Sequence, residues 1–69
     1  MVNTPYLEEK IKQSGKRKAY LADKCGCSIQ SLRLKITGKY DFTTSQVQVL
    51  CKELGVTSPK EMEKIFFKV

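Results

Sequence analysis

The sequence predicts an all-α fold, a compact bundle of five short helices. Apolar residues recur at intervals of three and four along the 69-residue chain, as on the buried face of a helix. Capping residues, glycines and prolines divide this pattern into five segments, and no segment has a strand pattern of comparable strength. A chain of this length has room for one small core, so we expect residues 1–69 to form a single domain.

The first predicted helix covers about residues 5–13. We expect Thr4 to cap this helix, Pro5 to occupy its first position and Ser14–Gly15 to end it. The second covers about residues 18–25 and ends at Gly26, which can adopt the left-handed conformation of a helix C-terminus. The apolar residues of these two helices are Tyr6, Leu7, Ile11, Ala19, Leu21, Ala22 and Cys25.

The third predicted helix is short, covering about residues 29–37. Ser28 is placed to cap its start, and Thr37–Gly38 breaks it. Leu32 and Ile36 lie one turn apart and are expected to face the core.

The fourth and fifth helices have the clearest start signals. Thr43 with Gln46 forms a capping box, and Gly55 closes the fourth helix. Ser58, Pro59 and Glu61 combine a cap, a first-turn proline and an acidic third residue, which is the strongest helix start in the chain. The expected buried residues are Val47, Leu50, Cys51 and Leu54, then Met62, Ile65 and Phe66.

Two of the helical patterns meet at Gly26, which is the layout of a helix-turn-helix. The residues that carry the motif are Leu21–Ala22, Gly26–Cys27–Ser28, Leu32, Ile36 and Gly38, followed by the helix from Thr43 to Leu54 and by Gly55–Val56–Thr57. In these residues the chain resembles the lambda-repressor-like class of DNA-binding domains, which includes phage Cro and repressor proteins and XRE-type bacterial regulators. The resemblance covers nearly the whole chain. It implies a Cro-sized transcriptional regulator, or a small accessory protein of a phage lysis–lysogeny switch.

The charge of the chain favours a polyanionic partner. Thirteen Lys and Arg residues against seven Asp and Glu give a formal charge of +6. Asp23 is the only acidic residue between positions 10 and 40, and a merely solvated lysine-rich surface is the alternative interpretation. The cations of that stretch are Lys10, Lys12, Lys16, Arg17, Lys18, Lys24, Arg33, Lys35 and Lys39.

In a helix that enters the major groove, the early residues and those opposite the core face the bases. Gln30 can pair with adenine and Arg33 with guanine, although a phosphate contact or a solvated side chain is the alternative for Arg33. Leu34 lies opposite the core stripe and suits a thymine methyl group. Ile29 can do likewise or be partly buried. The predicted base contacts are Ile29, Gln30, Ser31, Arg33 and Leu34.

Phosphate contacts are expected near the helix ends. Cations at the start of the second helix oppose its dipole, so a bound phosphate explains them better than a random basic loop. Tyr40 is the least certain member, because its ring can instead pack beside Phe42. The predicted phosphate contacts are Lys16, Arg17, Lys18, Ser28, Lys35, Thr37, Lys39 and Tyr40.

The expected partner is a double-stranded DNA operator, an inverted repeat bound by a homodimer with half-sites about 34 Å apart. The fifth helix is the candidate dimerisation element, because Ile65, Phe66, Phe67 and Val69 crowd apolar surface into the tail. Closure of the core over the first and fourth helices is the alternative explanation for these residues.

Other functions have weaker support in the sequence. The main rival is a phage modulator of repression that docks onto a companion repressor, and an antitoxin of this fold is a further alternative. The chain has no His and no clustered pair of carboxylates, so we expect neither an enzyme nor a cofactor. Cys25, Cys27 and Cys51 form no complete zinc set and are expected to be reduced, buried and apolar, with redox or metal sensing as the alternative. No apolar run reaches the roughly 18 residues of a membrane span and no signal peptide is visible, which favours a soluble protein of the bacterial cytoplasm or of a phage-infected host cell.

Overall fold

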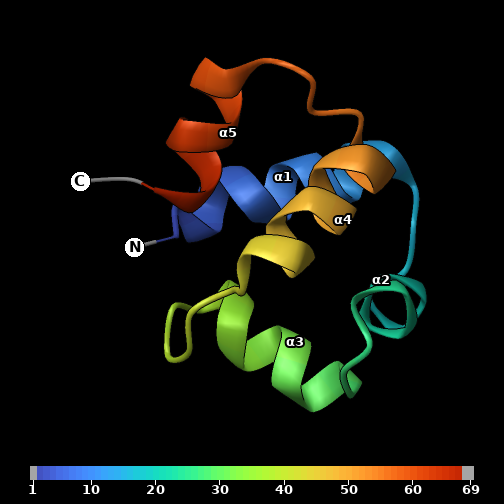
Figure 1. Ribbon diagram of the computed structural model, residues 1–69. Coiled ribbons are helices and arrows are strands. Elements are labelled where there is room, and N and C mark those ends of the chain that lie inside the picture. Colours follow the sequence, from blue (N-terminus) through green and yellow to red (C-terminus); the bar gives the residue numbers. More distant parts are fainter. Residues whose placement is uncertain (1, 68–69) are drawn as a thin grey trace.

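The computed structural model describes residues 2–67, and within this range the chain is helical without strands, as the sequence predicts (Figure 1). Five helices follow one another along the chain: α1 (Thr4–Ser14), α2 (Lys18–Cys25), α3 (Ile29–Ile36), α4 (Thr44–Leu54) and α5 (Pro59–Phe66). Their bounds differ from the predicted ones by one residue or none, which is within the usual fraying of helix ends.

One core joins all five helices. α4 packs against both α1 and α2, while α3 packs against α1 and α2, and α5 packs against α1. In Figure 1, α3 lies at one end of the molecule and α5 at the other, with α4 between them. The largest fully buried side chains come from all five helices and are Leu7, Leu21, Leu32, Ile36, Leu50 and Ile65. Each of these was predicted to face the core.

The start of α1 differs from the prediction. Asn3, not Thr4, occupies the position before the first helical residue, and no side chain caps this helix. The hydroxyl of Thr4 instead donates a hydrogen bond of 2.6 Å to the carbonyl of Ile36, at the end of α3. The side chain that was expected to serve its own helix therefore bonds to another one.

The turn between α2 and α3 has the predicted form. Gly26 has φ 72° and ψ 30°, the left-handed conformation that other residues adopt only with strain. The N–H of Cys27 then donates to the carbonyl of Ala22 at 3.0 Å, and the hydroxyl of Ser28 accepts from the N–H of Ser31 at 3.1 Å. Ala19, which the apolar pattern placed on the inner side of α2, is exposed, because α2 buries only Leu21 and Ala22.

The two strongest predicted caps behave differently. Thr43 and Gln46 form the predicted capping box, with each side chain bonded to the backbone of the other residue at 3.2 and 3.1 Å. Ser58 occupies the cap position of α5, and Pro59 and Glu61 lie in its first turn as predicted, but the side chain of Ser58 makes no cap hydrogen bond. Glu61 is directed to α1 instead, where it bonds the hydroxyl of Tyr6 at 3.2 Å and the ammonium of Lys10 at 3.3 Å.

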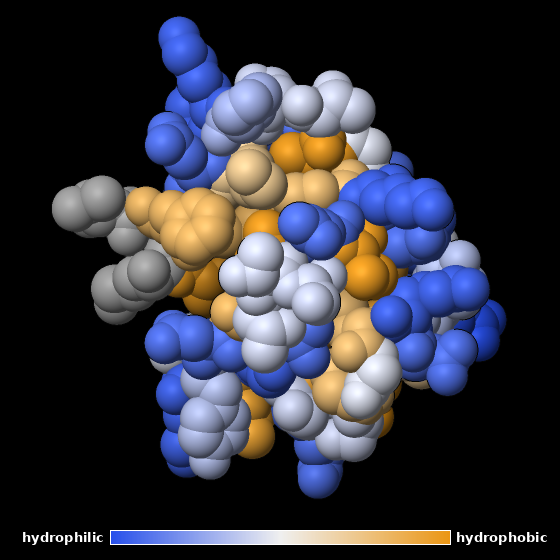
Figure 2. All heavy atoms as spheres, viewed as in Figure 1, coloured by the Kyte–Doolittle hydropathy of each residue, from blue (hydrophilic) through white to orange (hydrophobic). Residues whose placement is uncertain are grey.

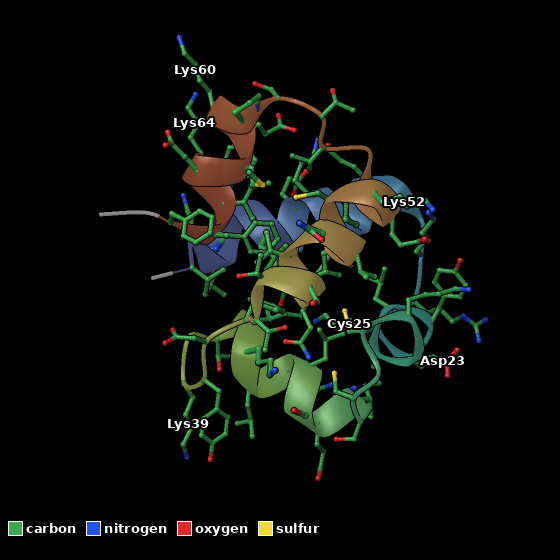
Figure 3. The ribbon with its side chains drawn as sticks, viewed as in Figure 1. Asp23, Cys25, Lys39, Lys52, Lys60 and Lys64 are labelled. Atoms are coloured by element: carbon green, nitrogen blue, oxygen red, sulfur yellow. The ribbon has the colours of Figure 1, made fainter. Side chains whose placement is uncertain are left out.

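The three cysteines are free and lie on the core, as expected for apolar side chains, although only Cys51 is fully buried. Burial raises the pKa of Cys25 and of Cys51 above the ordinary thiol value. Both groups are therefore protonated at neutral pH and are weak nucleophiles. In Figure 3, Cys25 points from α2 toward the interior.

Within residues 2–67 no helix is both long enough and apolar enough to cross a bilayer.

Candidate nucleic-acid interface

α3 presents one face to the core and the other to solvent. Leu32 and Ile36 are 1% and 2% exposed, which fixes the inner face of the helix. Gln30 and Arg33 lie on the exposed face, and neither side chain has a hydrogen bond or an ion pair with any residue between 2 and 67. Two long polar side chains are thus free to bind another molecule at the edge of the fold (Figure 1).

The other three residues predicted to touch bases are half-buried. Ile29 packs against the core, which is the second of the two roles considered for it. The backbone N–H of Ser31 is used by the cap of α3, which leaves its hydroxyl available. Leu34 does not belong to the core cluster, in agreement with its predicted position opposite Leu32. All five residues come together on α3, and Gln30 and Arg33 are the most accessible.

Two of the cations before and within α2 have partners inside the protein. The ammonium of Lys16 lies 2.6 Å from the carbonyl oxygen of Glu53 and 3.1 Å from its carboxylate. The hydrogen bond from Lys16 is the main reason why the pKa of Glu53 is lowered. Lys18 is paired with Glu8 at 3.0 Å. The structure thus explains Lys16 and Lys18 without a phosphate, whereas Arg17 is exposed.

At the C-terminal end of α3, too, some of the predicted phosphate contacts are bonded within the protein and others are exposed. The ammonium of Lys35 donates to the side-chain oxygen of Gln46 at 2.6 Å, so it is tied to the cap of α4. The hydroxyl of Thr37 donates to the carbonyl of Leu34 at 2.9 Å. Lys39 is exposed, and Figure 3 shows it pointing away from the body of the protein.

The positive charge that remains unpaired is spread over both ends of the molecule. Of the cations that precede residue 40, Lys10, Lys16 and Lys18 are neutralised by glutamates. Around α3 the remaining cations are Arg33, Lys35 and Lys39, with Asp41 as an acidic neighbour in the following loop. Lys60 and Lys64 project from α5 at the other end (Figure 3).

Tyr20 is a surface feature that the sequence patterns considered above did not single out. Its ring is exposed, and the ammonium groups of Lys16 and Lys24 lie 5.9 and 5.4 Å from the ring centroid. Both distances fall within the range of cation–π attraction. Part of the signal was present in the sequence, because the spacing of four between Tyr20 and Lys24 places these two side chains on one face of the second helix.

A hollow of about 310 Å³, lined by aromatic and aliphatic side chains together with Asp41, opens beside the end of α3 and the end of α5. The rings of Phe42 and Phe66 meet edge to face inside it, with centroids 5.4 Å apart. Tyr40 and Phe67 stand at the hollow with 53% and 54% of their surface exposed. Figure 2 shows apolar surface in several patches across one face, one of them next to the point where the chain ends emerge. The residues that line the hollow are Val2, Tyr40, Asp41, Phe42, Val47, Phe66 and Phe67.

The hollow refines two of the predictions. Ile65 and Phe66 are buried in the core, so core closure accounts for these two residues, and among the described residues of the α5 end only Phe67 remains as exposed apolar surface. Val69 lies outside the described residues. Tyr40 lines the same hollow as Phe42, which favours the packing alternative over a phosphate contact for its ring.

A second, wider groove lies between α1 and α5, away from α3. Its volume is about 640 Å³, and charges of both signs line it, from Glu9, Lys10 and Glu61, together with Asn3, Pro5, Tyr6 and Gln13. No group of three or more metal-ligating side chains occurs in residues 2–67.

Comparisons of the chain with models of protein families, with curated proteins and with solved structures found no match.

Proposed function

We propose that the chain is a sequence-specific DNA-binding transcriptional regulator, a Cro-like repressor of a phage or prophage in the lambda-repressor-like class. In this proposal α2, the Gly26 turn and α3 form a helix-turn-helix, and α3 is the recognition helix that enters the major groove of the operator. The packing of α3 against α2 and the left-handed Gly26 between them support this arrangement.

The observation that carries the proposal is the pair of free side chains on α3. Gln30 and Arg33 are exposed, three residues apart on the helix side that faces away from Leu32 and Ile36. An amide can bond the N6 and N7 of adenine, and a guanidinium can bond the O6 and N7 of guanine.

Phosphate contacts supply the remaining affinity. Arg17, Ser28 and Lys39 are exposed: Arg17 precedes α2, Ser28 caps α3 and Lys39 lies in the loop after α3. Lys16 and Lys18 must leave Glu53 and Glu8 before they can bind a phosphate, so we assign them a smaller share. Lys35 and Thr37 contribute after their intramolecular bonds rearrange, and Tyr40 contributes least.

The test is the binding of the purified chain to duplexes enriched from a random pool. We expect an enriched inverted repeat to be bound with an affinity that falls with salt by a slope of about 0.9 per neutralised phosphate on logarithmic axes. Arg33→Ala should reduce the preference for the enriched sequence by about 1–3 kcal/mol, because one base pair loses its bidentate partner. Fluorescence anisotropy with enriched and scrambled duplexes measures both quantities.

Lys60→Ala is the matched control, since Lys60 is a cation at the opposite end of the molecule (Figure 3). It should leave the preference unchanged. If Arg33→Ala and Lys60→Ala behave alike, the assignment of α3 to the groove is wrong.

The hollow favours a second candidate function, a modulator that docks onto a companion repressor. Tyr40 and Phe67 are exposed and line the hollow, so the same two rings would contact either a companion repressor or a second copy of this chain. Absence of binding to every duplex at low salt, together with co-elution with a companion repressor, would favour this function over operator binding.

A further inference from the structure

The C-terminal end of α3 is held by hydrogen bonds to the last four carbonyl groups of the helix. Three of them accept from backbone N–H groups of the next few residues, in the pairs Thr37 to Arg33, Gly38 to Lys35 and Lys39 to Leu34. The fourth, the carbonyl of Ile36, accepts from the hydroxyl of Thr4 at 2.6 Å across 32 positions of sequence. One of the four carbonyl groups at this end is therefore bonded by a side chain from a different helix.

Thr4 is itself fixed in place. It is the first residue of α1, and the preceding Asn3 donates its backbone N–H to the carbonyl of Ile65 in α5 at 2.6 Å. The carbonyl of Asn3 accepts from the N–H of Leu7, which begins the helical bonding of α1. A threonine side chain is short and has few rotamers, so its hydroxyl forms a stiff connection. The bond thus links the end of α3 to α1 and, through Asn3, to α5.

The other contacts that hold α3 leave its tilt less well defined. Leu32 and Ile36 lie one turn apart on a single stripe, and a helix anchored along one stripe can roll about it. Lys35 reaches Gln46 through a long side chain with many rotamers, which constrains the backbone weakly. The Thr4 bond acts directly on the backbone at the end of the helix.

We propose that Thr4 is a positioning residue for base recognition: its hydroxyl fixes the orientation of α3 through the carbonyl of Ile36. This inference rests on the proposed function of α3 as the recognition helix. Bidentate contacts with base edges need well-placed side chains, whereas attraction to phosphates tolerates small shifts. Loss of the bond should therefore weaken binding to the preferred duplex more than binding to an unrelated one.

Thr4→Val and Thr4→Ser form a matched pair of variants. Valine keeps the shape and removes the donor, while serine keeps the donor. We expect Thr4→Val to bind the enriched duplex roughly fivefold more weakly, since one hydrogen bond to a part-buried carbonyl contributes about 1 kcal/mol. Its affinity for a scrambled duplex should change by less than about twofold, and Thr4→Ser should stay within about twofold of the parent on both duplexes.

Amide hydrogen exchange of the free protein gives a second measurement that does not depend on DNA. Exchange at Gly38 and Lys39, whose N–H groups bond carbonyls of α3, should be faster in Thr4→Val than in Thr4→Ser, with amides of α4 unchanged. If Thr4→Val does not fold, Thr4→Ala replaces it in both experiments.

The outcomes separate the two proposals. Unchanged selectivity together with unchanged exchange in Thr4→Val overturns the role of Thr4. If Thr4→Val weakens binding to both duplexes equally, Thr4 serves general stability and not positioning, which also overturns the inference. If the parent protein prefers no duplex, the proposed function fails, and the exchange at Gly38 and Lys39 alone decides whether Thr4 holds the end of α3.

Discussion

Glutamate side chains decide which of the lysines remain free to meet a polyanion. Each of three glutamates takes up one cation from another part of the chain, in the pairs Glu8 with Lys18, Glu53 with Lys16 and Glu61 with Lys10. Pairs this exposed stabilise the fold only slightly, but they reduce the positive field at the start of α2. The free guanidinium of Arg33 gains importance in consequence.

The pair of Lys16 and Glu53 leads to a prediction about pH. Since the pKa of Glu53 is lowered in the folded protein, the pair stabilises the fold above the ordinary glutamate pKa of 4.5, and this stabilisation is lost as the pH falls through the lower, folded-state pKa. We expect the melting temperature to drop at acidic pH by less in Glu53→Gln than in the parent. Thermal unfolding followed by circular dichroism between neutral and acidic pH checks this, with the exposed Glu63→Gln as control.

A drop of the same size in Glu53→Gln as in the parent would show that the pair with Lys16 does not contribute to stability. The control matters because every carboxylate titrates in this range, and only the difference between the variants reports on one of them.

At the scale of the helices, two starts with similar sequences are held in different ways. The start of α4 depends on a local capping box, whereas α5 depends on contacts with distant residues: Ile65 in the core and Glu61 at the surface of α1. Helix α4 has eleven residues and α5 has eight, so both are too short to be stable as isolated helices in water. Their stability therefore comes from the fold, and capping adds to it only where the side chain is in place.

This difference predicts unequal effects of two alanine substitutions. Thr43→Ala should lower the free energy of unfolding by about 1 kcal/mol, because it removes the side chain that accepts from the N–H of Gln46. Ser58→Ala should lower it by less than about 0.5 kcal/mol, because Ser58 makes no such bond. Urea denaturation measures both, and equal losses would contradict the assignment of the two caps.

At the scale of the whole molecule, the proposed DNA-binding helix and the hollow lie on adjoining parts of the surface. Tyr40 follows α3 by four residues and lines the hollow together with Phe67, which follows α5. The described molecule measures 27 by 24 by 21 Å, so the 34 Å between half-sites of one helical turn exceeds its longest dimension.

If a homodimer forms through the hollow, its stability should depend on the exposed side chain of Phe67. Phe67→Ser should raise the dissociation constant of a homodimer by at least about tenfold, because an exposed aromatic anchor is lost from the interface. Tyr20→Ser is the control, since Tyr20 is an exposed ring outside the hollow. Sedimentation equilibrium over a range of concentrations compares the variants. Equal dissociation constants for the two variants, or a parent protein that stays monomeric, would show that the hollow is not part of a homodimer interface.

Sequence patterns determined the helices, their order and most of the core. Apolar spacing located Leu21, Leu32 and Leu50 in the interior, and turn chemistry located the ends at Gly26 and Gly55. These features depend on residues within one or two turns of each other, so the information is local. The exposed face of α3 follows from the same spacing, and for this reason the sequence alone identifies Gln30 and Arg33 as accessible residues.

Only the tertiary structure decided how polar side chains are used. No pattern in the neighbouring sequence predicts that Thr4 donates to the carbonyl of Ile36, that Glu61 accepts from Tyr6 of α1, or that Lys16 pairs with Glu53. A hydroxyl, carboxylate or ammonium can be satisfied by any partner within reach, and reach depends on which helices pack together. The periodicity of a short sequence fixes which face of each helix is apolar. The choice of polar partners, and the hollow built from residues near 2, 41 and 67, arises when those faces meet.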